Sequence, residues 1–216
     1  MTDFTVARKS MVDCQIRPAD VTSYKIIEAM LSVPRENYVP EKLKEVAYCG
    51  DHLKLSSKRS LLDPRILAKM LDLLNIQEDE LILDVGPGLG YSSALISCMA
   101  EAVVCVEENF FAEQAEAILA KEAADNVVVH KGNLFEGAEK YGPYDALIIQ
   151  GGVEVISDKL LRQLKVAGRV VAIFIQDGVG ECRLGLKSQS DIDWVFAFNA
   201  SAKVLDGFTK EVNFTL

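Results

Sequence analysis

Residues 81–91 read Leu-Ile-Leu-Asp-Val-Gly-Pro-Gly-Leu-Gly-Tyr, so that an aspartate precedes three regularly spaced glycines, Gly86, Gly88 and Gly90. The apolar residues predict a buried strand, the glycines a tight turn, and the residues after Tyr91 a helix. A strand, a glycine turn and a helix in this order let the backbone approach a nucleotide-like ligand closely. Asp84 places a carboxylate just before the turn, which disfavours a phosphate and favours a cationic or hydroxyl-bearing ligand.

A second carboxylate, Glu107, ends the next apolar run, 23 residues after Asp84. In open α/β sheets an acidic residue about 20 residues past the first strand binds ribose hydroxyls. The alternative is a solvated residue at a helix start, a role that Glu108 would fill equally well. Asn133 follows the third predicted strand, where it suits either the ligand or a turn. Gln150 closes the fourth predicted strand beside the same site.

Apolar runs that alternate with helical patterns predict the scaffold for these residues. Strands are predicted at 80–85, 103–106, 127–130, 145–149 and 169–175. Such alternation indicates an α/β fold, in which a mostly parallel sheet carries helices on both faces and binds ligands at the carboxyl ends of its strands. Two further strands, Trp194 to Phe198 and Val212 to Leu216, are expected to form an antiparallel pair at the sheet edge.

Helices and loops are predicted ahead of the sheet. We expect a helical extension with a substrate-facing loop over residues 1–78 and the ligand-binding domain over residues 79–216. Asp20 or Thr22 is the expected cap of one helix, which Pro34 ends. Another helix is expected to begin at Asp63-Pro64.

The composition of the chain argues against nucleic acid and membranes as partners. The chain of 216 residues is 50% hydrophobic and 25% charged, with a net charge of -9, which opposes binding to nucleic acid. The densest basic stretch, Lys54 to Arg65, is interpreted as solvated or substrate-facing. No apolar stretch of 18 residues and no secretory signal occurs, so we expect a soluble protein with no membrane partner.

Five cysteines without a C-x-x-C pair, and only two histidines, argue against a metal site. The cysteines lie in apolar settings, which favours reduced, buried thiols in a cytoplasmic protein. His52 and His130 are expected to be structural.

The pattern Asp-x-Gly-x-Gly-x-Gly resembles the first motif of class I S-adenosylmethionine-dependent methyltransferases. Other segments are similar to protein-L-isoaspartate O-methyltransferases: Val33 to Pro40 to their "VPRE-aromatic-VP" element, Gly142 to Ile149 to their "PYDAI" strand, and Leu160 to Val171 to their "LixQLKxGGRLV" element. Gly132-Asn133 stands where that family has Gly-Asp. The resemblance covers roughly residues 10 to 176.

This resemblance implies a Rossmann-like class I fold with a mostly parallel seven-stranded sheet, and S-adenosylmethionine as the cofactor. The expected cofactor-binding residues are Asp84, Gly86, Pro87, Gly88, Gly90, Tyr91, Glu107, Glu108, Asn133, Leu134 and Gln150.

One departure affects the acceptor site. The family has a Thr-Ile-Ser-Gln/Ala-Pro element whose serine is implicated in holding the substrate carboxylate, and the matching stretch here is Ser60 to Pro64. The candidate acceptor loop therefore contains Ser60, Leu62 and Asp63, with Leu62 at the serine position. Asp63 would repel a carboxylate.

Methyl transfer to an ionised carboxylate requires no acid or base, so the sequence identifies no catalytic residue. Three interpretations follow. The first is a methyltransferase for isoaspartyl carboxylates in damaged proteins, the second a methyltransferase of the same fold with a different acceptor, such as a small molecule, and the third a protein that binds S-adenosylmethionine without catalysis. The sequence does not indicate an oligomeric state.

Overall fold

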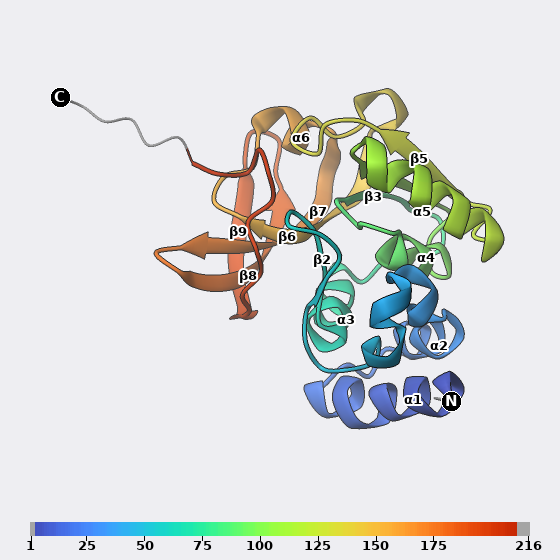
Figure 1. The fold of residues 1–216 in the computed structure, drawn as a ribbon. Coiled ribbons are helices and arrows are strands. Elements are labelled where there is room, and N and C mark those ends of the chain that lie inside the picture. Colours follow the sequence, from blue (N-terminus) through green and yellow to red (C-terminus); the bar gives the residue numbers. More distant parts are fainter. Residues whose placement is uncertain (1–2, 211–216) are drawn as a thin grey trace.

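The computed structural model describes residues 3–210 and is built on a seven-stranded sheet with helices packed against it (Figure 1). The strand order is β5-β4-β3-β6-β7-β8-β9, parallel from β5 to β7 and antiparallel from β7 to β9. The strands are β3 (Leu81–Val85), β4 (Ala102–Glu107), β5 (Val127–Lys131), β6 (Tyr144–Val153), β7 (Leu164–Gln176), β8 (Val179–Lys187) and β9 (Ile192–Asn199). The predicted α/β class and seven-stranded sheet are confirmed.

Successive side chains of a strand point to opposite faces of the sheet, and each face is covered by its own hydrophobic core. Ile82 joins a core that includes residues of α3 (Pro64–Leu74), α4 (Tyr91–Ser97) and α5 (Asn109–Lys121). Leu83 joins the core on the opposite face, with α6 (Asp158–Arg162), Leu134 and the segment around Leu205. The second face therefore owes more of its cover to loops than to helices.

The chain before the sheet forms short helices and one hairpin. The helical segments are α1 (Phe4–Met11), the π-helix Val12–Ile16, the 3-10 turns Arg17–Ala19, Arg35–Tyr38 and Glu41–Val46, and α2 (Tyr24–Ser32); Glu139–Tyr141 is a later 3-10 turn. Strands β1 (Leu53–Lys54) and β2 (Ser60–Leu61) pair antiparallel. The predicted boundary at residue 78 remains a prediction. Residues on both sides of it, among them Met30, Leu67 and Ile82, lie in one continuous core.

One predicted helix start is confirmed and another is wrong. Asp63 caps α3, where its Oδ1 accepts the Arg65 N–H at 2.7 Å. Neither Asp20 nor Thr22 caps α2, whose N-cap is Ser23. Asp20 instead ends the preceding 3-10 turn in a left-handed conformation with φ 65°, which a short polar residue tolerates.

The predicted edge of the sheet needs correction. The strand expected at Trp194 to Phe198 exists within β9, but its neighbour is β8, which the sequence did not suggest. Gly180 and Gly185 weaken the strand pattern of β8, yet Gly185 is required because an added Cβ would lie 2.5 Å from Ile192 Cγ2. The other expected strand, Val212 to Leu216, lies outside the described residues.

The expectation of buried thiols is only partly met. Cys105 and Cys182 are buried, whereas Cys14, Cys49 and Cys98 are exposed, and all five are free. Apolar neighbours in sequence do not bury a side chain that faces outward from a helix or loop. Within residues 3–210, no helix is long and apolar enough to cross a membrane.

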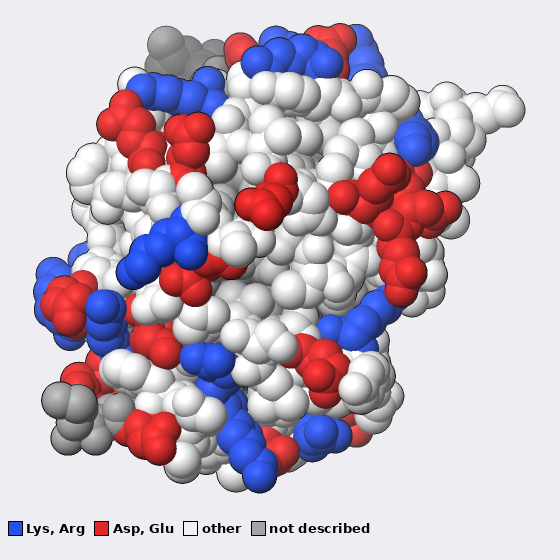
Figure 2. Space-filling model, turned by 90° about the vertical axis from the view of Figure 1, so that its right-hand side faces the viewer, with Lys and Arg blue, Asp and Glu red and all other residues white. Residues whose placement is uncertain are grey.

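Surface charge is mixed on the face seen in Figure 2. Acidic and basic side chains alternate there between broad uncharged areas, without an extended basic patch. This face lacks the concentrated positive charge typical of nucleic-acid binding.

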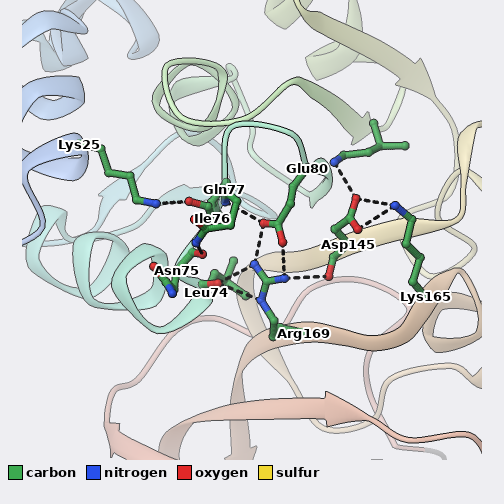
Figure 3. A network of polar contacts seen from close by, with 10 residues as sticks. Lys25, Leu74, Asn75, Ile76, Gln77, Glu80, Asp145, Lys165 and Arg169 are labelled. Atoms are coloured by element: carbon green, nitrogen blue, oxygen red, sulfur yellow. Dashed lines mark hydrogen bonds and ion pairs between the residues drawn. The ribbon is translucent and has the colours of Figure 1, made fainter.

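A polar network joins the amino-terminal ends of β3 and β6 to the end of α3 and to β7 (Figure 3). Arg169 of β7 pairs with Glu80 and also donates to the Leu74 carbonyl. Asp145 accepts from the Leu81 N–H and from Lys165. This network lies at the opposite ends of β3 and β6 from the glycine turn.

Candidate functional site

The glycine turn between β3 and α4 has backbone conformations that residues with a Cβ atom rarely adopt. Gly86, Gly88 and Gly90 have φ values of 74°, 66° and 94°, in the left-handed region. Space is equally restricted, since a Cβ on Gly88 would lie 2.5 Å from Leu55 Cδ1. The Gly86 N–H donates to the Val106 carbonyl, which holds the turn against the end of β4.

Glu107 ends β4 beside this turn and is fully buried. Its Oε1 accepts the Gly88 N–H at 2.8 Å, and its Oε2 accepts the Glu108 N–H at 2.9 Å. Burial raises the pKa of Glu107 above its ordinary value, against the opposing effect of the Arg59 guanidinium. Glu108 differs sharply, because its side chain is 48% exposed. The two predicted candidates are thus distinguished by burial, and Glu107 is the one at the turn.

Asp84 lies beneath the turn instead of facing an open site. Its Oδ2 accepts from the hydroxyls of Ser92 and Ser93 at 2.6 and 2.7 Å, and its Oδ1 from Gln150 Nε2 at 3.0 Å. Burial raises the pKa of Asp84 to about 6, although these three donors favour the charged form. In this arrangement Asp84 and Gln150 hold β3, α4 and β6 together.

Arg59, expected to be solvated or substrate-facing, is buried against the glycine turn. Its side chain is 1% exposed, and its Nε donates to both oxygens of Glu107 at 3.1 and 3.3 Å. Its Nη2 donates to Glu108 Oε2 at 3.1 Å. The prediction of a solvated side chain is wrong at Arg59, because a buried carboxylate 48 positions further along the chain attracts this cation out of solvent, whereas Lys54, Lys58 and Arg65 are exposed as expected.

Four other predicted site residues have different surroundings. Tyr91 is fully buried, with the Arg35 guanidinium 4.9 Å from its ring centroid, so it joins the turn to the N-terminal helices. Asn133 is exposed and its Oδ1 accepts the Phe135 N–H at 2.9 Å, as in a turn. Leu134 packs on Gly86, 3.2 Å from an added Cβ. Pro87 is buried within the turn.

Leu205 is a site residue that the sequence did not suggest. It is 2% exposed and packs on Gly86 and Gly151, where an added Cβ would lie 3.3 and 2.6 Å from its side chain. Backbone hydrogen bonds between Gly152 and the Lys203 and Leu205 backbone hold the segment there. Gly151 and Gly152 have no side chains, which allows this close approach.

The candidate acceptor loop borders a small cavity at the end of β6. The cavity has a volume of about 20 Å³ and is lined by His52, Lys58, Ser60, Leu62, Gln150, Gly151, Ala202, Lys203 and Leu205. Leu62 contributes to this lining but is 2% exposed, and its carbonyl accepts from Arg35 at 2.7 Å. Asp63 caps α3 and pairs with Arg65 at 3.2 Å, so its charge is compensated. The structure thus weakens the expected repulsion of a carboxylate by Asp63.

Within residues 3–210, no group of three or more histidine, cysteine, aspartate and glutamate side chains could hold a metal ion. His52 instead links two segments: its Nδ1 accepts the Asp63 N–H at 2.9 Å, and its Nε2 lies 2.7 Å from the Ser201 carbonyl.

Known proteins share this architecture and much of the sequence. Protein-L-isoaspartate O-methyltransferases of Geobacter metallireducens and Syntrophus aciditrophicus are 35% and 34% identical, over 78% and 79% of this chain and 79% of each relative. A solved protein-L-isoaspartate O-methyltransferase has a TM-score of 0.82 at 21% identity, over 93% of this chain and 66% of that chain.

A putative protein-L-isoaspartate O-methyltransferase from Plasmodium falciparum, solved in complex with S-adenosyl-L-homocysteine, has a TM-score of 0.78 at 16% identity, over 95% of this chain and 99% of that one. These two structures show the shared fold. The family model described as protein-L-isoaspartate(D-aspartate) O-methyltransferase matches residues 7–191. With most of its length matched, the chain belongs to the protein-L-isoaspartate(D-aspartate) O-methyltransferase family.

Proposed function

We propose that the protein is an S-adenosylmethionine-dependent methyltransferase that methylates isoaspartyl-type carboxylates in damaged proteins. The observation that carries the proposal is the position of Glu107 at the carboxyl ends of β3 and β4. This buried carboxylate accepts the Gly88 N–H of the glycine turn on Oε1 and the Glu108 N–H on Oε2. A carboxylate at this place suits the two hydroxyls of a ribose. The family membership agrees with this chemistry.

The residues around the turn fit such a cofactor. Glu107 would accept from the ribose hydroxyls. The absence of side chains on Gly86 and Gly88 would let the ligand approach the backbone closely once Leu55, which packs on Gly88, has moved aside. Leu134 and Leu205 provide apolar walls beside Gly86. The cofactor, when bound, supplies an electrophilic methyl group on a sulfonium.

The acceptor would bind over the end of β6, where the cavity of about 20 Å³ has room for a water molecule and would have to widen to admit a carboxylate. Lys203 among its lining residues favours an anionic group, whereas the charge of Lys58 is compensated by Asp206. An isoaspartyl carboxylate is ionised at neutral pH and requires no base, so these residues need only bind it, orient it and exclude water.

The first experiment follows methyl transfer from S-adenosylmethionine to an isoaspartyl peptide, read as base-labile methyl incorporation, with the matching aspartyl peptide as control. We expect incorporation into the isoaspartyl peptide alone. Incorporation into neither peptide, with cofactor binding intact, would refute the acceptor assignment.

A pair of variants tests the cofactor site. Glu107→Gln should weaken binding of S-adenosylhomocysteine about tenfold or more, because hydrogen bonds to a charged group are worth about 1.5–3 kcal/mol. The neighbouring Glu108→Gln, at a half-exposed side chain, should have a smaller effect. Equal effects measured by calorimetry would remove Glu107 from the site.

A different acceptor is the second candidate, favoured by Leu62, which offers no hydroxyl at the position where the family has serine. Turnover of S-adenosylmethionine with small carboxylic acids but not with isoaspartyl peptides would support it. Binding of the cofactor without turnover on any acceptor would indicate a non-catalytic protein. A cytoplasmic location, which cell fractionation would test, also remains a prediction.

A further inference from the structure

The hairpin that carries the acceptor loop reaches onto the glycine turn. Strands β1 and β2 form its stem, and residues 55–59 form its tip. The tip is a defined turn, because the N–H groups of Leu55 and Ser56 both donate to the Arg59 carbonyl at 3.0 Å. The Ser56 hydroxyl oxygen also accepts the N–H groups of Lys58 and Arg59. The tip therefore presents Leu55 and Arg59 to the turn in fixed positions.

Three N–H donors already occupy most of the hydrogen-bonding capacity of Glu107 in this state. A carboxylate has two oxygens and about four lone-pair positions. The Gly88 and Glu108 N–H groups take one position on each oxygen. Arg59 Nε has one N–H, which it shares between both oxygens at 3.1 and 3.3 Å. Three donors on about four positions leave room for one more at most, so two ribose hydroxyls bind only if Arg59 moves away.

We propose that Arg59 sets the affinity for the cofactor by occupying on Glu107 the place of the ribose hydroxyls, so that the hairpin tip must withdraw before S-adenosylmethionine binds. This inference rests on the proposed function. The inference adds to the proposed function a side chain, Arg59, that competes with the cofactor for Glu107.

The remaining contacts of the tip are weaker than those of Arg59. Lys58 pairs with Asp206 at 2.5 Å, but the two side chains are 62% and 44% exposed. Lys203 donates to the Ser57 carbonyl in an exposed position. Exposed pairs contribute little because water screens them, whereas Arg59 and Glu107 are withdrawn from water on both sides. Arg59 is therefore the principal attachment of the tip.

Calorimetry with S-adenosylhomocysteine tests the proposal. Arg59→Gln should bind about tenfold or more tightly than the wild type, because the ligand no longer displaces a charged donor. Arg65→Gln is the matched control: its guanidinium lies on the same stretch, is 56% exposed and does not contact Glu107, so its dissociation constant should stay within about twofold.

The outcomes distinguish the role of Arg59 from the assignment of the cofactor. Wild-type binding with an unchanged or weaker constant in Arg59→Gln would overturn the role of Arg59 and leave the cofactor assignment standing. Absence of binding in both proteins at millimolar ligand would overturn the cofactor assignment and this inference with it.

A second measurement needs only the wild-type protein. The Arg59 Nε–H is buried in its contact with Glu107, so its nuclear magnetic resonance signal should exchange slowly with water in the free protein; Arg59→Gln identifies the signal by its loss. Saturation with S-adenosylhomocysteine should speed this exchange. A signal that stays protected in the saturated protein would show that Arg59 remains on Glu107, and would overturn the proposal.

Discussion

Replacement of Arg169 by methionine should destabilise the protein by about 3–5 kcal/mol, a large share of the 5–15 kcal/mol typical of a folded domain. Arg169 donates to both Glu80 oxygens at 2.6 and 2.7 Å and, through Nε and Nη2, to the Leu74 carbonyl at 3.0 and 2.8 Å (Figure 3). Methionine keeps much of the apolar stem and removes every donor. The substitution therefore isolates the polar contacts.

The magnitude follows from the groups left behind. Loss of hydrogen bonds to a charged group is worth about 1.5–3 kcal/mol, and a carbonyl left without a partner at the end of a helix costs about 1–3 kcal/mol more. Leu74 is the last residue of α3, so its carbonyl has no partner within the helix. Glu80 would keep the Gln77 N–H at 2.8 Å, with its side chain 13% exposed.

The pH dependence has a definite sign. Burial alone would raise the pKa of Glu80, but Arg169 and the Gln77 N–H lower it below its ordinary value. Since the folded-state pKa is depressed, this carboxylate stabilises the fold above the unfolded value of 4.5 and the contribution is lost as the pH falls through the folded-state pKa. Arg169→Met should reduce that acid-side loss.

Urea unfolding followed by circular dichroism at pH 7 and pH 4 measures both effects. Arg183→Met is the matched control, because Arg183 pairs with Glu181 at 2.7 Å between side chains that are 33% and 36% exposed. The control should lose about 1 kcal/mol or less. Losses of the same size in the two variants, with unchanged dependence on urea, would refute the argument from burial.

Two further substitutions test the core around the site. Asp84→Asn should flatten the pH dependence of the free energy of unfolding. Because the folded-state pKa of Asp84 is raised to about 6, the protonated carboxyl stabilises the fold below its ordinary pKa of 3.8, and about 3 kcal/mol is lost as the pH rises through 6. Parallel pH curves for the variant and the wild type would contradict this prediction. Leu62→Ser should lower the free energy of unfolding by about 2–4 kcal/mol, whereas Leu186→Ser, at a half-exposed side chain, should lower it by about 1 kcal/mol or less. Thermal unfolding measures both, and equal decreases in melting temperature would contradict the burial of Leu62.

The sequence was sufficient for the parts of the site that follow from one local pattern. Gly86, Gly88 and Gly90 between an apolar run and a helix determine a turn, and the parallel sheet then brings Glu107 beside it. The helix start at Asp63-Pro64 was equally local. The turn and the helix start depend on backbone conformation, which neighbouring residues largely set, and the place of Glu107 follows from the general rule that ligands bind at the carboxyl ends of parallel strands.

The parts that the sequence did not predict depend on distant contacts. Arg59 stands in a basic, serine-rich stretch that is typical of a solvated loop, and nothing near it indicates a buried partner 48 residues away. Leu205 belongs to a tail that was poorly matched to the family. β8 carries two glycines, and its pairing with β7 decides its conformation despite them.

Arg35 has a consequence for any attempt to reduce this enzyme to a minimal catalytic unit. It is fully buried, and it joins the Ala47 and Leu62 carbonyls at 2.7 Å each while its guanidinium lies over Tyr91 at the start of α4. The N-terminal helices thus form part of the wall of the fold and are not a detachable module. Transplanting residues 79–210 alone onto another acceptor domain would expose the part of the sheet that α3 covers, over β7 and β8, and remove the support of the helix that follows the glycine turn. A productive chimera would have to be cut within surface loops that leave Arg35 and both its carbonyl partners together.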